Sequence, residues 1–76
     1  MYVETFAQRL KKAREDTGFT QREVARDLNM KQATIASYET GRTQPDIESM
    51  GKMIDFYGID ANWLFGTRGG KEEIRR

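Results

Sequence analysis

Residues 20–42 read TQREVARDLNMKQATIASYETGR and decide the fold, because they combine two short helical segments with a turn between them. Thr20 and Glu23 have the spacing of a capping box, in which each side chain bonds the backbone N–H of the other residue at the start of a helix. Asn29 tolerates the left-handed backbone conformation that stops a helix. The pattern therefore predicts a short helix that begins after Thr20 and ends at Asn29.

The second segment, from about residue 31 to residue 40, is poor in large apolar side chains. Ile35 and Tyr38 lie three residues apart and share one face, and Gly41 is suited to end the helix. The other positions carry mostly small or polar side chains. Two short helices joined by a tight turn, the second with one narrow apolar face, are typical of a helix-turn-helix element that reads DNA.

Helices are also predicted on both sides of this pair. Apolar or small residues three and four positions apart indicate a helix over residues 3–17 that ends at Gly18. Asp46 is expected to cap a fourth helix and Asp60 a short fifth one, which Gly66 closes. The stripes expected to face the core are Val3, Phe6, Leu10, Ala13 and Thr17 in the first helix, and Ile47, Met50, Met53, Ile54 and Tyr57 in the fourth.

These patterns predict an all-α fold, with five short helices in a single domain over residues 1–66. Residues 67–76 read TRGGKEEIRR, with two consecutive glycines and mostly charged side chains. We interpret that segment as a flexible polar tail.

The composition narrows the possible functions. The chain of 76 residues has no cysteine and no histidine, which removes disulfides, the commonest zinc ligands and any imidazole base. No paired-carboxylate motif and no glycine-rich phosphate loop of recognised spacing is present either. We therefore expect no enzyme activity, no metal and no cofactor. The lack of cysteine favours a reducing cytoplasm, and no apolar run is long enough for a membrane span.

Charge is distributed unevenly along the chain. The net charge is +1, but residues 45–66 contain four acidic side chains and one basic one. The remaining residues are therefore net basic. Such segregation is compatible with one face that meets a polyanion while another faces water, and a solvated face often has the same pattern.

From Leu10 to Gly66 the chain resembles the Xre and lambda-repressor-like helix-turn-helix family of phage and bacterial repressors. The resemblance lies in TQ at 20–21, IxxYExGRxxP at 35–45 and WLxG at 63–66. The matching residues are Leu10, Arg14, Gly18, Thr20, Gln21, Val24, Ala25, Leu28, Thr34, Ile35, Tyr38, Glu39, Gly41, Arg42, Pro45, Gly58, Trp63, Leu64 and Gly66. The resemblance implies a lambda-repressor-like domain and a sequence-specific regulator of transcription, most often a repressor, that binds double-stranded DNA.

The resemblance also implies which side chains face the bases. In that family the second helix of the pair lies in the major groove, which assigns Gln32, Ala33 and Ser37 to base edges. Gln32 can bond N6 and N7 of adenine, Ala33 can contact a thymine methyl, and Ser37 can give a less selective hydrogen bond. Without the resemblance, Gln32 and Ser37 are better interpreted as polar residues that merely face solvent.

Phosphate contacts are expected at both ends of the helix pair. Gln21 begins the first helix of the helix-turn-helix pair, where a side chain and unpaired backbone N–H groups together can meet a phosphate. Thr40 and Arg42 follow the second helix and resemble a second phosphate clamp. Lys31 is unusual, because relatives often carry Ser or Thr there as the helix cap and a lysine cannot accept that hydrogen bond. The remaining candidates for DNA contact are Thr20, Arg22, Thr34 and Gln44.

Two pairs of residues have structural roles to be tested. The family resemblance implies a partly buried ion pair between Arg14 and Glu39, which joins the first helix to the end of the third. Phe56 and Phe65 are candidates for a protein contact, although partial burial against the last helix of the domain explains them equally well.

We expect a homodimer on a two-fold operator, because one domain with about three base-reading side chains and little net charge should bind DNA weakly. The last helix and the tail are the expected places for self-association. An unidentified regulatory protein is a further expected partner. The alternative function is that of an antitoxin or phage-regulator type of interaction module, which holds another protein while DNA binding serves autoregulation.

Overall fold

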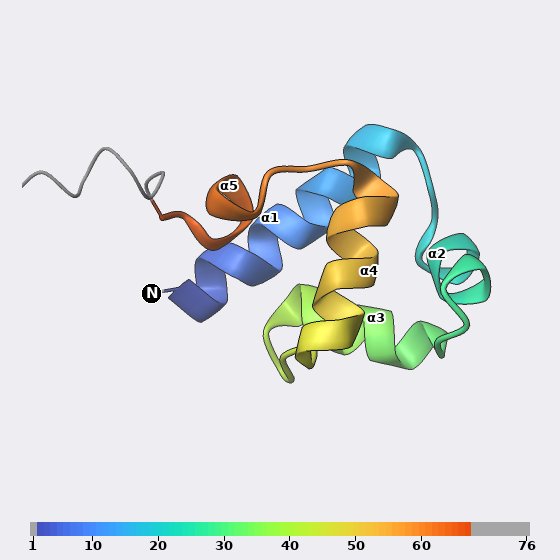
Figure 1. Cartoon of the computed structure of the whole chain (residues 1–76). Helices are drawn as coiled ribbons and strands as arrows, with labels where there is room; N and C mark the ends of the chain where they lie inside the picture. The colour runs from blue at the N-terminus through green and yellow to red at the C-terminus, as the bar shows by residue number, and fades with distance from the viewer. Residues whose placement is uncertain (1, 68–76) are drawn as a thin grey trace, which may run out of the picture.

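The computed structural model describes residues 2–67, and in this range it contains five α-helices and no strand (Figure 1). The helices are α1 (Tyr2–Thr17), α2 (Gln21–Asp27), α3 (Gln32–Thr40), α4 (Ile47–Tyr57) and α5 (Ala61–Phe65). The predicted all-α, five-helix fold is therefore confirmed. Most of the predicted tail lies outside the described residues, whereas Thr67 still bonds Asn62 through its backbone N–H and its hydroxyl.

Side-chain caps fix where the helices begin. Thr20 and Glu23 form the predicted capping box, with N···O distances of 3.1 and 2.9 Å. Asp46 caps α4 by accepting a hydrogen bond from the Ser49 N–H, and this bond lowers the pKa of the Asp46 carboxyl. Asp60 caps α5 in the same way. The three predicted caps are thus confirmed, and each one satisfies a backbone donor that the helix itself leaves unpaired.

The core draws at least one side chain from every helix. α1 is the central element, because α3, α4 and α5 all pack against it, while α2 packs mainly on α3. Figure 1 shows α4 crossing in front of α1, with α3 along the lower edge of the domain. The fully buried large side chains are Leu10, Val24, Ile35, Met53 and Leu64. No helix within residues 2–67 is both long and apolar enough to cross a membrane.

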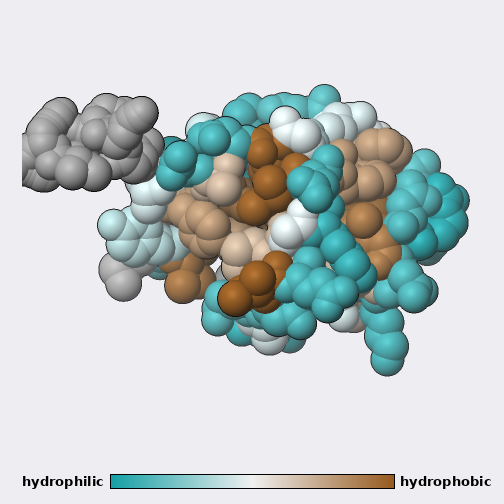
Figure 2. Space-filling view, viewed as in Figure 1, coloured by the Kyte–Doolittle hydropathy of each residue, from teal (hydrophilic) through white to brown (hydrophobic). Residues whose placement is uncertain are grey.

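Three residues of the predicted apolar stripes are exposed, so that part of the prediction is wrong. Val3 and Thr17 lie near the ends of α1, a helix about 24 Å long that extends past the elements packed on its middle. Ile47 is 87% exposed because it begins α4 at the edge of that helix's apolar face. Ala7 is buried although the stripe omitted it. Figure 2 shows the resulting hydrophobic surface around the starts of α1 and α4.

The two phenylalanines that were candidates for a protein contact are half-buried within the domain. Phe56 packs against Phe19, with ring centroids 5.0 Å apart. Phe65 stacks on Phe6 of α1 at 5.4 Å. The expected partial burial is present for both, but Phe56 meets the segment between α1 and α2 instead of α5, where the sequence placed it.

Candidate nucleic-acid interface

The turn between α2 and α3 is built on Asn29, whose φ is 58°. The Asn29 N–H bonds the Arg26 carbonyl, and the next N–H, of Met30, bonds the Ala25 carbonyl at 2.7 Å. This pair of bonds is a Schellman motif, which closes a helix in a fixed direction. Met30 then packs against the core. The turn is therefore rigid, and it sets the angle at which α3 leaves α2.

One side of α3 is buried and the other is open, as the sequence predicted. The buried residues are Ile35, Tyr38 and Glu39; the exposed ones are Gln32, Ala33 and Thr40; Thr34, Ala36 and Ser37 are half-buried. At 100° per residue, Ala33, Ser37 and Thr40 lie within a narrow arc opposite the buried side. Gln32 lies about 80° outside that arc and about 20° from Glu39, and it is exposed at the first position of the helix. The open side carries only small or uncharged polar side chains.

A buried ion pair holds α3 in place. Arg14 Nε and Nη2 donate to the two carboxylate oxygens of Glu39 at 2.7 and 3.1 Å, which is a bidentate geometry. The two side chains are 11% and 2% exposed. The hydrogen bond with Glu39 raises the pKa of the Arg14 guanidinium, although burial acts in the opposite direction. The ion pair implied by the family resemblance is therefore present.

The same carboxylate also orients Gln21. Gln21 Nε2 donates to Glu39 Oε1 at 3.0 Å, and Arg14 Nη1 donates to the Phe19 carbonyl at 2.9 Å. One carboxylate thus connects α1, α2 and α3. The Gln21 side chain was predicted to meet a phosphate, and this inward hydrogen bond uses one of its two amide protons. This inward contact was not predictable from the sequence, because residues 21 and 39 meet only in the folded chain.

Five polar residues surround a surface hollow of about 330 Å³ between the starts of α2 and α3. They are Arg14, Thr20, Gln21, Arg22 and Gln32. The structure therefore brings four of the predicted DNA-contact residues together around one depression, with two guanidinium groups beside it. Thr20 is also the capping residue, so its hydroxyl oxygen already accepts the Glu23 N–H. A phosphate at this hollow would meet the exposed cation of Arg22, whereas the charge of Arg14 is balanced by Glu39, and Gln32 would lie next to it.

A second hollow lies at the other end of α3, where Thr40 and Gly41 face α1. Gly41 has a φ of 80° and ends the helix, and the Arg42 N–H bonds the Ser37 carbonyl behind it. The Thr40 hydroxyl donates to the same carbonyl, and both side chains at 40 and 42 are exposed. Gln44 is exposed and its amide donates to the Gly41 carbonyl at 3.4 Å.

Gln8 is a candidate that the sequence did not single out. It is exposed on α1 and borders the hollow beside Thr40 and Gly41. Its amide could reach a phosphate held by that segment, whereas Glu4, which borders the same hollow, would repel one. The helical spacing places Gln8 on the solvent side, but only the packing of α1 against α3 reveals its neighbours.

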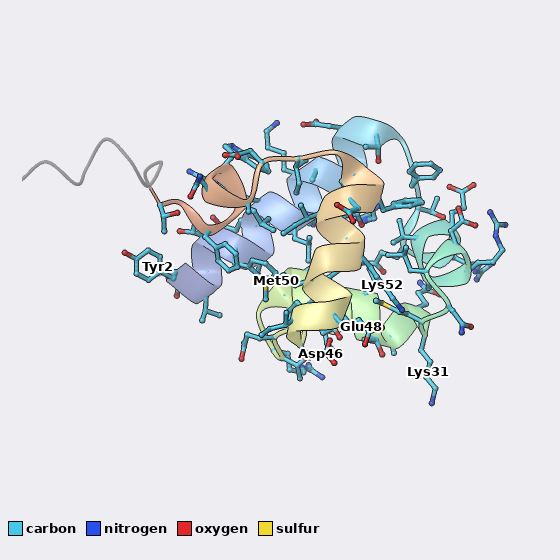
Figure 3. All side chains as sticks on the ribbon, viewed as in Figure 1. Tyr2, Lys31, Asp46, Glu48, Met50 and Lys52 are labelled. Atoms are coloured by element: carbon cyan, nitrogen blue, oxygen red, sulfur yellow. The ribbon has the colours of Figure 1, made fainter. Side chains whose placement is uncertain are left out.

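Lys31 precedes α3 and extends away from the domain (Figure 3). It is the N-cap residue by its backbone, with φ −88° and ψ 146°, yet no side chain accepts a hydrogen bond there. Its carbonyl accepts the N–H groups of Thr34 and Ile35. No other side chain among the described residues supplies the cap. The ammonium group therefore stands at the start of the helix that carries Gln32 and Ala33.

The comparisons with known proteins agree with this geometry. A family model described as helix-turn-helix matches residues 10–64, and the chain belongs to that helix-turn-helix family. The matched range includes α2, α3 and the ion pair, and it begins and ends within the stretch that carries the Xre-like signatures.

Three relatives indicate the range of similar proteins. The chain is 31% identical over 72 residues to the HTH-type transcriptional regulator ImmR of Bacillus subtilis, a match that covers 95% of this chain and 54% of that protein. It is 30% identical over 59 residues to the SPbeta prophage-derived uncharacterized HTH-type transcriptional regulator YonR of the same organism, covering 78% and 55%. It is 39% identical over 50 residues to the endothelial differentiation-related factor 1 homolog of Gallus gallus, covering 66% and 34%. The chain thus spans about half the length of the two bacterial relatives.

Proposed function

We propose that this chain is the DNA-binding domain of a transcriptional regulator, which inserts α3 into the major groove of double-stranded DNA and reads its sequence. We further propose that it acts as a cytoplasmic repressor and binds a two-fold operator as a homodimer. The relatives named as HTH-type transcriptional regulators support the general function. Repression, the dimer and the location are our own extension.

One observation carries the proposal, namely the asymmetry of α3. Its buried side is locked by the Arg14–Glu39 pair, while Ala33 is exposed on the opposite side and Gln32 at the first position of the helix, without a large apolar or acidic side chain beside them. A helix of this kind fits the major groove, where Gln32 can make two hydrogen bonds to adenine and Ala33 can contact a thymine methyl. Arg22, Lys31 and Arg42 are exposed cations on either side and would contact phosphates, which position the helix without reading sequence.

The proposal is tested by selecting bound sites from random duplex DNA and comparing two variants on the selected site and on random DNA. Gln32→Ala should lose about 1–3 kcal/mol of binding free energy on the selected site and relax the preference at one base pair. Arg42→Ala should weaken binding to both duplexes alike and flatten the salt dependence on a single half-site by about one unit.

The measurement is fluorescence anisotropy at several salt concentrations. An equal loss on selected and random DNA for Gln32→Ala would remove that residue from base reading. Failure to enrich any site at all would contradict sequence-specific DNA binding.

A further inference from the structure

The domain leaves large hydrophobic side chains exposed in one region. Tyr2 is 67% exposed, Val3 42% and Ile47 87%, and these are the exposed large hydrophobic residues within residues 2–67. Tyr2 and Val3 begin α1, and Ile47 begins α4. Figure 2 shows brown and tan side chains gathered over these helix starts. Exposed hydrophobic side chains that cluster in this way often mark an interaction surface.

An apolar cavity of about 90 Å³ opens within the same region. Tyr2 borders it, and the other lining residues are Val3, Phe6, Gln44, Pro45, Met50 and Phe65. None of these carries a charge. Because an apolar cavity of roughly 150 Å³ holds a benzene molecule, this one is suited to a single branched side chain. We call the cavity together with Tyr2, Val3 and Ile47 the α1–α4 patch.

Ile47 and the cavity are neighbours on this patch. Ile47 follows Pro45 by two residues and precedes Met50 by one helical turn, and both of those residues line the cavity. A projecting side chain therefore stands beside an opening of matching size and chemistry. Within one copy of the chain the Ile47 side chain does not enter the cavity, because it points into solvent.

We propose that the α1–α4 patch is the surface through which two copies of this chain meet, with Ile47 of each copy in the cavity of the other. A two-fold contact uses the same patch on both subunits, so it needs a projection and a matching opening side by side on one surface. The uncharged lining avoids like-charge repulsion inside the cavity, while the exposed Asp46 and Glu48 flank Ile47 at its edge.

The area of the patch indicates a weak contact. Tyr2 and Ile47 together offer on the order of 300 Å² of exposed side chain, whereas a stable interface buries about 800 Å² on each partner. The contact alone should therefore dissociate at micromolar concentrations. When two copies occupy neighbouring half-sites, their high effective concentration makes the same contact favourable. This inference rests on the proposed function, because the DNA supplies that proximity.

The position of the patch is compatible with DNA binding. Pro45 and Ile47 follow the C-terminal end of α3, whereas Lys31 and Gln32 lie at its start. Figure 3 shows Tyr2 and Lys31 on opposite sides of the domain. A second copy seated on the patch would leave Gln32 and Ala33 uncovered, and of the candidates for DNA contact it would cover only Gln44, which lines the cavity.

The test introduces a charge into the patch. Ile47→Glu should preserve the fold, because Ile47 is exposed and an acidic residue is favourable in the first turn of a helix. Lys52→Gln is the matched control, since it changes the net charge equally on the exposed side of the same helix and lies outside the patch. DNA binding is measured on a duplex with one selected half-site and on a duplex with two. Self-association is measured by the concentration dependence of amide chemical shifts. The protein concentration is raised to about 1 mM, which is on the order of the dissociation constant of a weak dimer.

The parent and Lys52→Gln should bind the second half-site about tenfold more tightly than the first. They should also show concentration-dependent shifts at Tyr2, Val3 and Ile47. Ile47→Glu should keep its single-site affinity within about twofold and lose both effects. Unchanged cooperativity in Ile47→Glu would overturn the proposal, and so would shifts located on another surface or absent altogether. If the parent bound no single half-site, the proposed function would be refuted instead. The chemical shifts would still show whether two copies meet through the α1–α4 patch.

Discussion

Glu39 is the residue on which the orientation of α3 depends. Its carboxylate accepts hydrogen bonds from Arg14 on α1 and Gln21 on α2, although Glu39 itself is buried in α3. None of the three residues needs to touch DNA for this role. The carboxylate orients α3 through its hydrogen bonds to the neighbouring helices. Its loss should therefore lower the free energy of unfolding before it affects DNA binding.

We expect Glu39→Ala to lower the free energy of unfolding by about 3 kcal/mol, because the change leaves Arg14 as a buried charge without its partner. Tyr57→Phe is the control in the same region. The Tyr57 hydroxyl is buried and finds no hydrogen-bond partner among the described residues, and burial raises the pKa of Tyr57 to about 12. Removing that hydroxyl should leave stability unchanged or raise it by about 1 kcal/mol.

Urea denaturation followed by circular dichroism measures both variants. If Glu39→Ala unfolded at the same urea concentration as the parent, the ion pair would contribute nothing to the fold. A strong loss of stability in Tyr57→Phe would show that the hydroxyl has a hydrogen-bond partner.

At the scale of the helices, the start of α3 combines two opposing requirements. A Ser at the N-cap would accept a hydrogen bond from the backbone of the first turn, whereas Lys31 leaves that donor without a side-chain partner. Lys31 instead places a cation beside the outward face that carries Gln32 and Ala33. The first turn of the helix thus lacks the stability that a cap would add, and it has a positive charge next to the exposed Gln32 and Ala33.

We therefore expect Lys31→Ser to raise the free energy of unfolding by about 0.5–1 kcal/mol and to weaken DNA binding. Thermal denaturation and anisotropy titrations measure the two effects on the same sample. Lys12→Gln removes an equal charge from the exposed side of α1 and should leave DNA affinity unchanged. A variant that gained stability without losing affinity would show that Lys31 does not contact DNA.

The helices themselves were predictable from sequence because their signals are local. Thr20, Asn29 and Gly41 each fix a helix end through contacts within a few residues. The exposure of Ile47 and the inward turn of Gln21 were not predictable, since both depend on which helices pack together. The same limit applies to the site. Periodicity separated the outward side of α3 from its buried side, but the hollows beside Gln8 and Arg22 exist only in the folded domain.

At the scale of the whole molecule, charge is arranged so that a chain of net charge +1 can still meet a polyanion. Three exposed cations lie near α3: Arg22 on α2, Lys31 directly before α3 and Arg42 after it. Residues 45–66, which follow, contain four acidic side chains and one basic one, and the acidic ones lie on α4 and at the positions that cap α4 and α5. Binding strength should therefore depend on a few local cations and not on net charge.

This arrangement predicts the salt dependence of the complete complex. If each copy neutralises about three phosphates, two copies on a two-site duplex neutralise about six. A plot of the logarithm of the binding constant against the logarithm of salt concentration should then have a slope of about −5. Arg42→Gln should reduce that slope by about two units on the two-site duplex, since each copy loses one contact. Lys52→Gln, which removes a cation from the acidic side of the domain, should leave the slope unchanged although it changes the net charge equally. Equal effects of the two substitutions would mean that the protein attracts DNA through its overall charge, and the phosphate roles of Arg22, Lys31 and Arg42 would then be wrong.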